Sequence, residues 1–254
     1  MKSGQVLHWL CGLLVVLAGS SARAELLINE ILFNPPQADS TNEYVELRGT
    51  PNSLLPAGAW LLNVEGDTNG NPGTIQDLFD LSGLRVGQNG YLVLLQKNHR
   101  YTPNPLATVV TNSDQGDGWG SGSSSSMGHR GEGGQTELEN PSCTFLLVQT
   151  TNSPSIGDDL DQDDDGELDL SATNEWLILD AVGVLDSDGA GDRAYGRINF
   201  RRDKPPGNGA SASAGSTVVP LPFTPSYIAR NTDSNGWDRT RWVASDNLGG
   251  APPR

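Results

Sequence analysis

The chain has 254 residues, a formal net charge of −15 and a sequence pI near 4.4. That length allows one large domain or two small ones. So much negative charge argues against binding to a phosphate backbone, which needs clustered Lys and Arg, so nucleic acid is not an expected partner. It does suit a soluble exported protein, and it attracts divalent cations.

Residues 1–24 are predicted to be a secretory signal peptide. A lysine near the start precedes an apolar run, and the small-x-small pattern Ala22-Arg23-Ala24 marks a cleavage site. The apolar run is shorter than the roughly 20 residues that span a bilayer, and an uncleaved anchor is the alternative. We therefore expect a mature chain over 25–254, secreted to the extracellular space or the periplasm, without a stable membrane span.

Cleavage would leave Cys143 as the one cysteine, so no intramolecular disulfide could form. An exported chain without disulfides needs other sources of stability, such as core packing or a metal ion. Cys143 opens an apolar run, and we predict a buried structural cysteine there, not a reactive one.

Short apolar or alternating runs, separated by Gly, Pro, Asn and Asp, follow one another along the mature chain. Helical periodicity is almost absent after residue 25. This pattern predicts an all-β fold of the sandwich or barrel kind. The predicted strands cover 26–33, 43–49, 59–66, 90–96, 107–111, 143–149, 176–184, 194–200 and 239–245.

The alternation within 43–49 predicts a strand with one face toward the core and one toward water. The core face would carry Val45 and Leu47, and the wet face would carry Tyr44, Glu46 and Arg48.

Two segments, 112–134 and 203–216, are rich in Gly and Ser and are predicted to be long, mobile loops without core packing. Trp119 in the first loop could stack on a sugar ring, but a tryptophan that pins the loop to the β-structure is the favoured interpretation. No repeat at a fixed period is visible, so no solenoid is predicted.

The start of the mature chain, "LLINEILFNPPQADSTNEYVELRGT", resembles the start of lamin-tail domains of secreted bacterial proteins. Those domains open with an Ile-Asn-Glu strand, an Asn-Pro turn and a Glu-aromatic-aliphatic-Glu-Leu strand. The match covers about residues 26–49, and a weaker one runs through 54–67 and 81–95. The matching residues are Ile28-Asn29-Glu30, Asn34-Pro35 and Glu43-Tyr44-Val45-Glu46-Leu47.

The resemblance implies an immunoglobulin-like β-sandwich with long Gly/Ser-rich loops. Residues 25–254 would form a single lamin-tail-like domain, elaborated after about residue 100 because lamin-tail domains are usually much shorter. It also implies a module that is often attached to secreted or surface enzymes and that binds or scaffolds. The expected partner is an extracellular protein or glycan.

Residues 159–170, "DLDQDDDGELDL", gather seven carboxylates around Gly166. Two like charges about 4 Å apart repel by about 1 kcal/mol in water and about 4 kcal/mol at an effective dielectric constant of 20. Carboxylates that converge therefore call for a cation. An EF-hand calcium loop places oxygen ligands at positions 1, 3, 5, 7, 9 and 12, with Gly at position 6.

A loop that starts at Asp161 puts Gly166 at position 6. Position 12 is then Ala172, so Glu175 or a residue from another strand would complete the shell. Oxygen ligands in this number favour Ca²⁺ over zinc, and magnesium prefers a stricter octahedron. The predicted metal ligands are Asp161, Asp163, Asp165, Glu167 through its backbone carbonyl, Asp169 and Glu175. The alternative is a solvated acidic loop without a fixed metal.

A shorter acidic run at 186–192 lacks this spacing and is predicted to be a turn.

No catalytic residue is assigned. His99 and His129 have no partners at metal-ligand spacing, and no Gly-x-Ser-x-Gly elbow is present. Glu30, Glu43 and Glu46 could form a carboxylate pair of the glycosidase type, but structural roles are favoured.

The leading hypothesis is a secreted, non-catalytic lamin-tail-like module that binds calcium and acts in extracellular binding, adhesion or scaffolding. The alternative is a small secreted hydrolase, a nuclease, phosphatase or glycan-active protein, that uses carboxylates and calcium.

Overall fold

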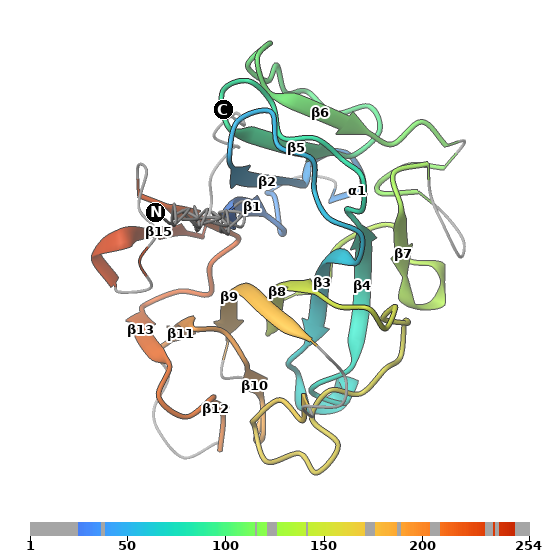
Figure 1. Ribbon diagram of the computed structural model, residues 1–254. Coiled ribbons are helices and arrows are strands. Elements are labelled where there is room, and N and C mark those ends of the chain that lie inside the picture. Colours follow the sequence, from blue (N-terminus) through green and yellow to red (C-terminus); the bar gives the residue numbers. More distant parts are fainter. Residues whose placement is uncertain are drawn as a thin grey trace, which may run out of the picture.

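The computed structural model describes residues 25–36, 39–114, 116–120, 126–140, 142–170, 176–186, 189–203, 209–231, 236 and 239–246. Nearly all of their regular structure is β-strand (Figure 1), which confirms the all-β prediction. The segment 1–24, predicted to be a signal peptide, lies outside these residues.

The strands are β1 (Leu26–Leu32), β2 (Tyr44–Gly49), β3 (Ala59–Glu65), β4 (Ile75–Asp80), β5 (Tyr91–Leu95), β6 (Thr108–Thr111), β7 (His129–Gly131), β8 (Cys143–Gln149), β9 (Leu177–Leu185), β10 (Arg193–Ala194), β11 (Ile198–Arg202), β12 (Ser211–Ala212), β13 (Thr217–Leu221), β14 (Tyr227–Arg230) and β15 (Trp242–Ser245). Short helical turns are α1 (Asp39–Asn42), η1 (Thr68–Gly70), η2 (Glu132–Gly134) and η3 (Arg239–Arg241).

Most strands belong to two sheets. The six-stranded sheet has the order β15-β14-β1-β2-β5-β6, and the seven-stranded sheet has the order β13-β11-β9-β8-β3-β4-β7. Figure 1 shows β1, β2 and β5 in the upper part of the molecule and β3, β4, β8 and β9 below them. Neighbouring strands are antiparallel in most of both sheets.

A shared apolar core joins the two sheets. Ile28, Val45 and Leu94 from the six-stranded sheet lie in the same buried cluster as Leu61 and Phe145 from the seven-stranded sheet. Each belongs to the inward set of an alternating strand, so the period of two in the sequence selects these residues for the core.

The predicted wet face of β2 is wrong. Tyr44 and Glu46 are fully buried, because the outer side of this sheet carries a second apolar cluster with Leu95, Tyr227 and the loop residue Tyr101. Both faces of β2 are therefore covered, although Val45 and Leu47 do point into the main core as expected.

Part of the chain winds as in a β-solenoid. β9, β11 and β13 are consecutive parallel neighbours, with Ile198 between Val182 and Thr217, and β10 and β12 stack in parallel beside them. The prediction that excluded a solenoid is wrong for this part. The successive turns differ in length, so the sequence shows no fixed period.

The predicted strand 194–200 is split into β10 and β11 at Gly196. A Cβ on Gly196 would lie 2.4 Å from the backbone nitrogen of Gly183, which is far closer than van der Waals contact. Glycine thus permits the close approach of two backbones that bends the chain from one solenoid face to the next.

The described residues of the Gly/Ser-rich segment 112–134 contradict the prediction that it packs no core. Trp119 is fully buried, lies edge-on to Phe79 with ring centroids 5.1 Å apart, and donates from Nε1 to a Glu43 carboxylate oxygen at 2.7 Å. Glu43 also accepts hydrogen bonds from Gln96 Nε2 and from the Leu138 backbone N–H. The expectation that Trp119 pins its loop is confirmed, and Glu43 has a structural role.

A buried ion pair ties the two sheets together. Arg230 Nη2 on β14 lies 2.6 Å from Asp180 Oδ2 on β9, and both side chains are fully buried. The same carboxylate oxygen accepts the Ile28 N–H at 2.9 Å, while Arg230 Nε donates to the Ile28 carbonyl at 2.7 Å. The guanidinium carbon also lies 4.4 Å from the centroid of the Trp242 ring. The Arg230–Asp180 ion pair and its hydrogen bonds to Ile28 therefore connect strands of both sheets.

Replacing Asp180 tests this junction. Asp180→Ala leaves Arg230 buried without its carboxylate and should lower the free energy of unfolding by about 3–5 kcal/mol in urea denaturation. Asp203→Ala, which removes an exposed carboxylate, is the control and should change it by less than about 0.5 kcal/mol. A loss below about 1 kcal/mol for Asp180→Ala would show that the pair does not hold the sheets together.

Candidate metal centres

The acidic loop, residues 159–169, lies on the outer face of the seven-stranded sheet. Its start is bonded to the segment that leads into β4, with Leu160 N–H donating to the Gly73 carbonyl at 2.9 Å. Asp169 N–H donates back to the Leu160 carbonyl at 2.6 Å and closes the loop. Leu160 and Leu168 pack with Trp60 and Tyr195 over this face. Apolar contacts thus hold a highly charged segment in one place.

Asp161 organises the interior of the loop. Its Oδ1 accepts the Asp165 N–H at 3.1 Å, and its Oδ2 accepts the Gly166 N–H at 3.0 Å and the Tyr195 hydroxyl at 2.8 Å. Gly166 has a φ of 91°, a conformation that glycine adopts without steric cost. Burial raises the pKa of Asp161, although these three donors favour its ionised form.

The loop brings together some of the predicted calcium ligands. Asp161, Asp163 and Asp169 each offer a carboxylate oxygen within 4.8 Å of the others. Asp161 is buried, while Asp163 and Asp169 are exposed, so a cation between them would keep access to water.

Other predicted ligands are directed elsewhere. Asp165 Oδ1 accepts the Glu167 N–H at 2.8 Å, and the Glu167 carboxylate accepts the Ala214 N–H. The Asp165 carboxylate does not join the group formed by Asp161, Asp163 and Asp169. The prediction for Glu167 concerns its backbone carbonyl, which the bond to Ala214 does not involve. Glu175 lies outside the described residues.

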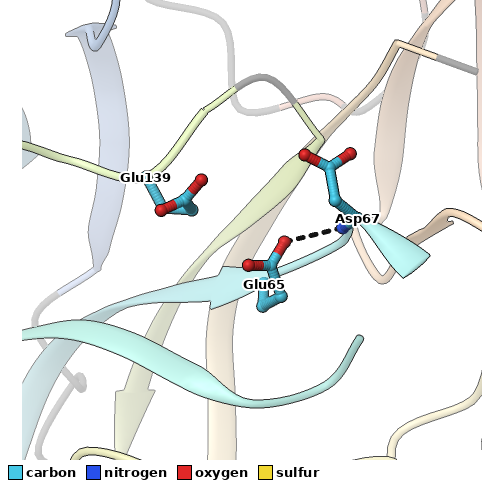
Figure 2. Close-up of side chains that lie close together, drawn as sticks. All are labelled: Glu65, Asp67 and Glu139. Atoms are coloured by element: carbon cyan, nitrogen blue, oxygen red, sulfur yellow. Dashed lines mark hydrogen bonds between the residues drawn. The ribbon is translucent and has the colours of Figure 1, made fainter. Parts of the chain in front are cut away.

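A second group of carboxylates, which the sequence did not indicate, lies at the end of β3 (Figure 2). Glu65 ends β3, Asp67 follows it, and Glu139 comes from the segment before β8, yet each offers an oxygen within 4.8 Å of the others. We call this group the β3 cluster. Glu65 Oε1 accepts the N–H groups of Gly66 at 2.8 Å and Asp67 at 2.6 Å. A Cβ on Gly70 would lie 2.0 Å from Glu65 Oε2, so glycine leaves room for this carboxylate.

Burial and mutual repulsion raise the pKa values of the carboxyl groups in the β3 cluster. Burial is the largest cause that raises the pKa of Glu65 and of Asp67. Burial, followed by the charge of Glu65, raises the pKa of Glu139 to about 7. Cys143, the first residue of β8, pairs with Glu65 on β3. Burial raises the pKa of the Cys143 thiol well above its usual value, so the thiol is protonated and buried, as predicted.

Asp67 also belongs to a third group, with Asp186 and Asp192. Here the carboxylates already have donors: Ser142 Oγ donates to Asp186 Oδ1 at 3.0 Å, and the Thr68 N–H and hydroxyl both donate to Asp192 Oδ1. Gly189 N–H donates to Asp192 Oδ2 at 2.6 Å and holds the described part of 186–192 in a turn, as predicted. These donors offset the repulsion within the group.

The remaining candidates for catalysis have structural partners. His129 is buried with Nε2 3.0 Å from Asp77 Oδ1, and its ring lies against Phe79. Glu30 accepts hydrogen bonds from the hydroxyls of Tyr44 and Tyr227, each at 3.0 Å.

Glu46 accepts a hydrogen bond from Asn29 Nδ2 at 2.6 Å. Like Glu30, it is buried within the six-stranded sheet, so these two carboxylates help to build the sheet.

Within the described ranges, no helix is long and apolar enough to cross a membrane. Comparison of the chain with protein-family models, with curated proteins and with solved structures found no match. The lamin-tail resemblance therefore rests on residues 26–49 and stays a prediction.

The raised pKa of Glu139 predicts a pH-dependent stability in the absence of metal. Between its ordinary value of 4.5 and about 7, the folded protein holds this proton more tightly than the unfolded chain, so stability falls as pH rises. Glu139→Gln, which mimics the protonated acid, should raise Tm in chelator above about pH 7 and leave it unchanged below about pH 4.5.

Exposed Glu137 provides the control, since Glu137→Gln should leave Tm unchanged at both ends of this range. A Tm difference between Glu139→Gln and the unsubstituted chain that does not vary with pH would contradict the assignment.

Proposed function

We propose that this chain is an exported, non-catalytic β-module that binds calcium through its acidic loop and acts in extracellular binding, adhesion or scaffolding. The observation that carries the proposal is the convergence of Asp161, Asp163 and Asp169 in a loop that the fold holds in a fixed shape. Several hard oxygen ligands without nitrogen or sulfur suit Ca²⁺.

The fixed shape of the loop supports this proposal. The Asp165 and Gly166 N–H groups already bond to Asp161, and Leu160 and Leu168 are packed on the sheet, so little ordering remains for binding. Ca²⁺ takes six to eight oxygens, and backbone carbonyls and water commonly complete such a shell. Calcium modules of extracellular proteins bind at about 10⁻⁴–10⁻³ M, which a partly exposed site can reach.

Export and the lamin-tail relationship belong to the same proposal. The pattern of residues 1–24 supports export, and the motif at 26–49 supports a lamin-tail-like module with an immunoglobulin-like core. The antiparallel strands β1, β2 and β5 facing β3, β4 and β8 across one core are compatible with that architecture. The parallel strands β9, β11 and β13 would then be the elaboration after about residue 100.

A calcium titration that is followed by NMR tests the proposal at the loop itself. The backbone amides of Asp165 and Gly166 should shift saturably, because both donate to the Asp161 carboxylate that would bind the ion. Asp163→Asn removes a ligand charge at an exposed position and should weaken the binding that these amides report at least about tenfold, or about 1.4 kcal/mol. Asp164→Asn, its exposed neighbour outside the group, should leave that binding unchanged.

Two results would contradict the proposed function. If the Asp165 and Gly166 amide signals do not shift in millimolar calcium, calcium binding by the acidic loop is excluded. Turnover of a phosphodiester, nucleotide or glycan substrate that chelator abolishes would replace the non-catalytic module with the hydrolase alternative.

A further inference from the structure

Asn63, which precedes Glu65 by two residues on β3, carries a buried side-chain oxygen without a hydrogen-bond partner in the described structure. Asn63 is 1% exposed, and its Nδ2 donates to the Glu139 carbonyl at 3.1 Å. That bond fixes which end of the amide is nitrogen, and Oδ1 is left without a hydrogen-bond partner in the described part of the structure. Buried acceptors usually have a hydrogen-bond partner, so this oxygen has the capacity to accept one more ligand, such as a water or an ion.

Asn63 is connected to two of the acidic residues, to Glu65 along β3 and to Glu139 through a hydrogen bond. Asn63 and Glu65 are two residues apart on β3, which pairs with β8 in unbroken register, so both project from the same face. The Asn63 amide is bonded to Glu139, which provides another carboxylate of the cluster. The residue that carries the unpartnered oxygen is thus two positions from Glu65 on one face of β3 and is hydrogen-bonded to the backbone of Glu139.

Hydrogen bonds hold two of the acidic residues, Glu65 and Glu139, in place. The Glu65 carboxylate is fixed by the Gly66 and Asp67 N–H groups. The Glu139 backbone is bonded on both sides, since its N–H donates to Asp77 Oδ2 at 3.2 Å and its carbonyl accepts from Asn63. Ligands that strands and backbone hydrogen bonds hold in place are positioned more accurately than ligands on a mobile loop.

From these observations we infer that the end of β3 is a second site for a hard divalent cation, with Glu65, Asp67, Glu139 and Asn63 Oδ1 as ligands. Three carboxylates and one amide oxygen form an all-oxygen set, which suits Ca²⁺ and disfavours zinc. The site shares no residue with the acidic loop and does not depend on calcium binding there. It would join the end of β3 to the segment that enters β8, two parts of the chain that no disulfide connects.

The test uses the full chain with calcium chloride as the probe and two sets of NMR reporters. The Gly66 and Asp67 amides, which donate to Glu65, report the β3 cluster, and the Gly166 amide reports the acidic loop. In an Asp163→Asn background, Gly66 and Asp67 should still shift saturably. This would separate the two sites.

Substitutions within the cluster should act on one reporter set only. Glu139→Gln should weaken the calcium response of Gly66 and Asp67 at least about tenfold and leave that of Gly166 unchanged. Glu137→Gln, an exposed change in the same segment, should alter neither. Asp67→Asn should repeat the result of Glu139→Gln and serves in its place if that variant does not fold.

Each other outcome overturns the inference. Gly66 and Asp67 amides that stay fixed while Gly166 moves would show that only the loop binds calcium. A response at Gly66 that both Glu139→Gln and Asp67→Asn leave intact would show that these carboxylates are not the ligands.

Discussion

Repulsion between carboxylates that the fold brings together is the constraint on which this structure depends. The chain carries a formal charge of −15, and Cys143 is free in the described part of the structure, so no disulfide there offsets the repulsion. The fold nevertheless gathers Asp161, Asp163 and Asp169 at one place and the β3 cluster at another. Hydrogen-bond donors offset part of this repulsion at Asp192, and also at Asp161 and Glu65. A cation would supply the counter-charge that neutral donors do not.

Apolar packing determines where these charges lie. The outer face of the seven-stranded sheet carries Trp60 and Leu62, which are covered by Leu160 and Tyr195. Since the segment that contains Leu160 also contains the acidic residues of the loop, burial of its leucines places those carboxylates over this outer face. On the other side of the same sheet, the Asp180–Arg230 pair fixes β9 to β14. The sites therefore depend on a scaffold that apolar packing and this ion pair hold together.

Local alternation in the sequence was enough to predict most of the central strands. β1, β2, β3, β5 and β8 lie within a residue or two of the predicted runs, because each alternates or is continuously apolar. β4 was missed because "IQDLFD" contains Gln76 and Asp77, which are buried and paired in the structure. The short strands β7 and β12 were missed because they lie in segments dominated by Gly and Ser. Their strand structure comes from neighbours elsewhere in the chain.

The candidate sites show the same limit. Regular spacing identified the acidic loop and the place of Gly166, since all its residues are close in sequence. It did not foresee that the Glu167 carboxylate accepts the N–H of Ala214, because Ala214 is distant in the sequence and the fold brings it to the loop. The β3 cluster joins residues 65, 67 and 139, so no local motif could have marked it.

A crystal structure determined in millimolar calcium, with anomalous scattering data, would test the central claim most directly. If the loop binds calcium, an anomalous peak is expected about 2.3–2.6 Å from carboxylate oxygens of Asp161, Asp163 and Asp169. An ordered loop with only water between these side chains would contradict it.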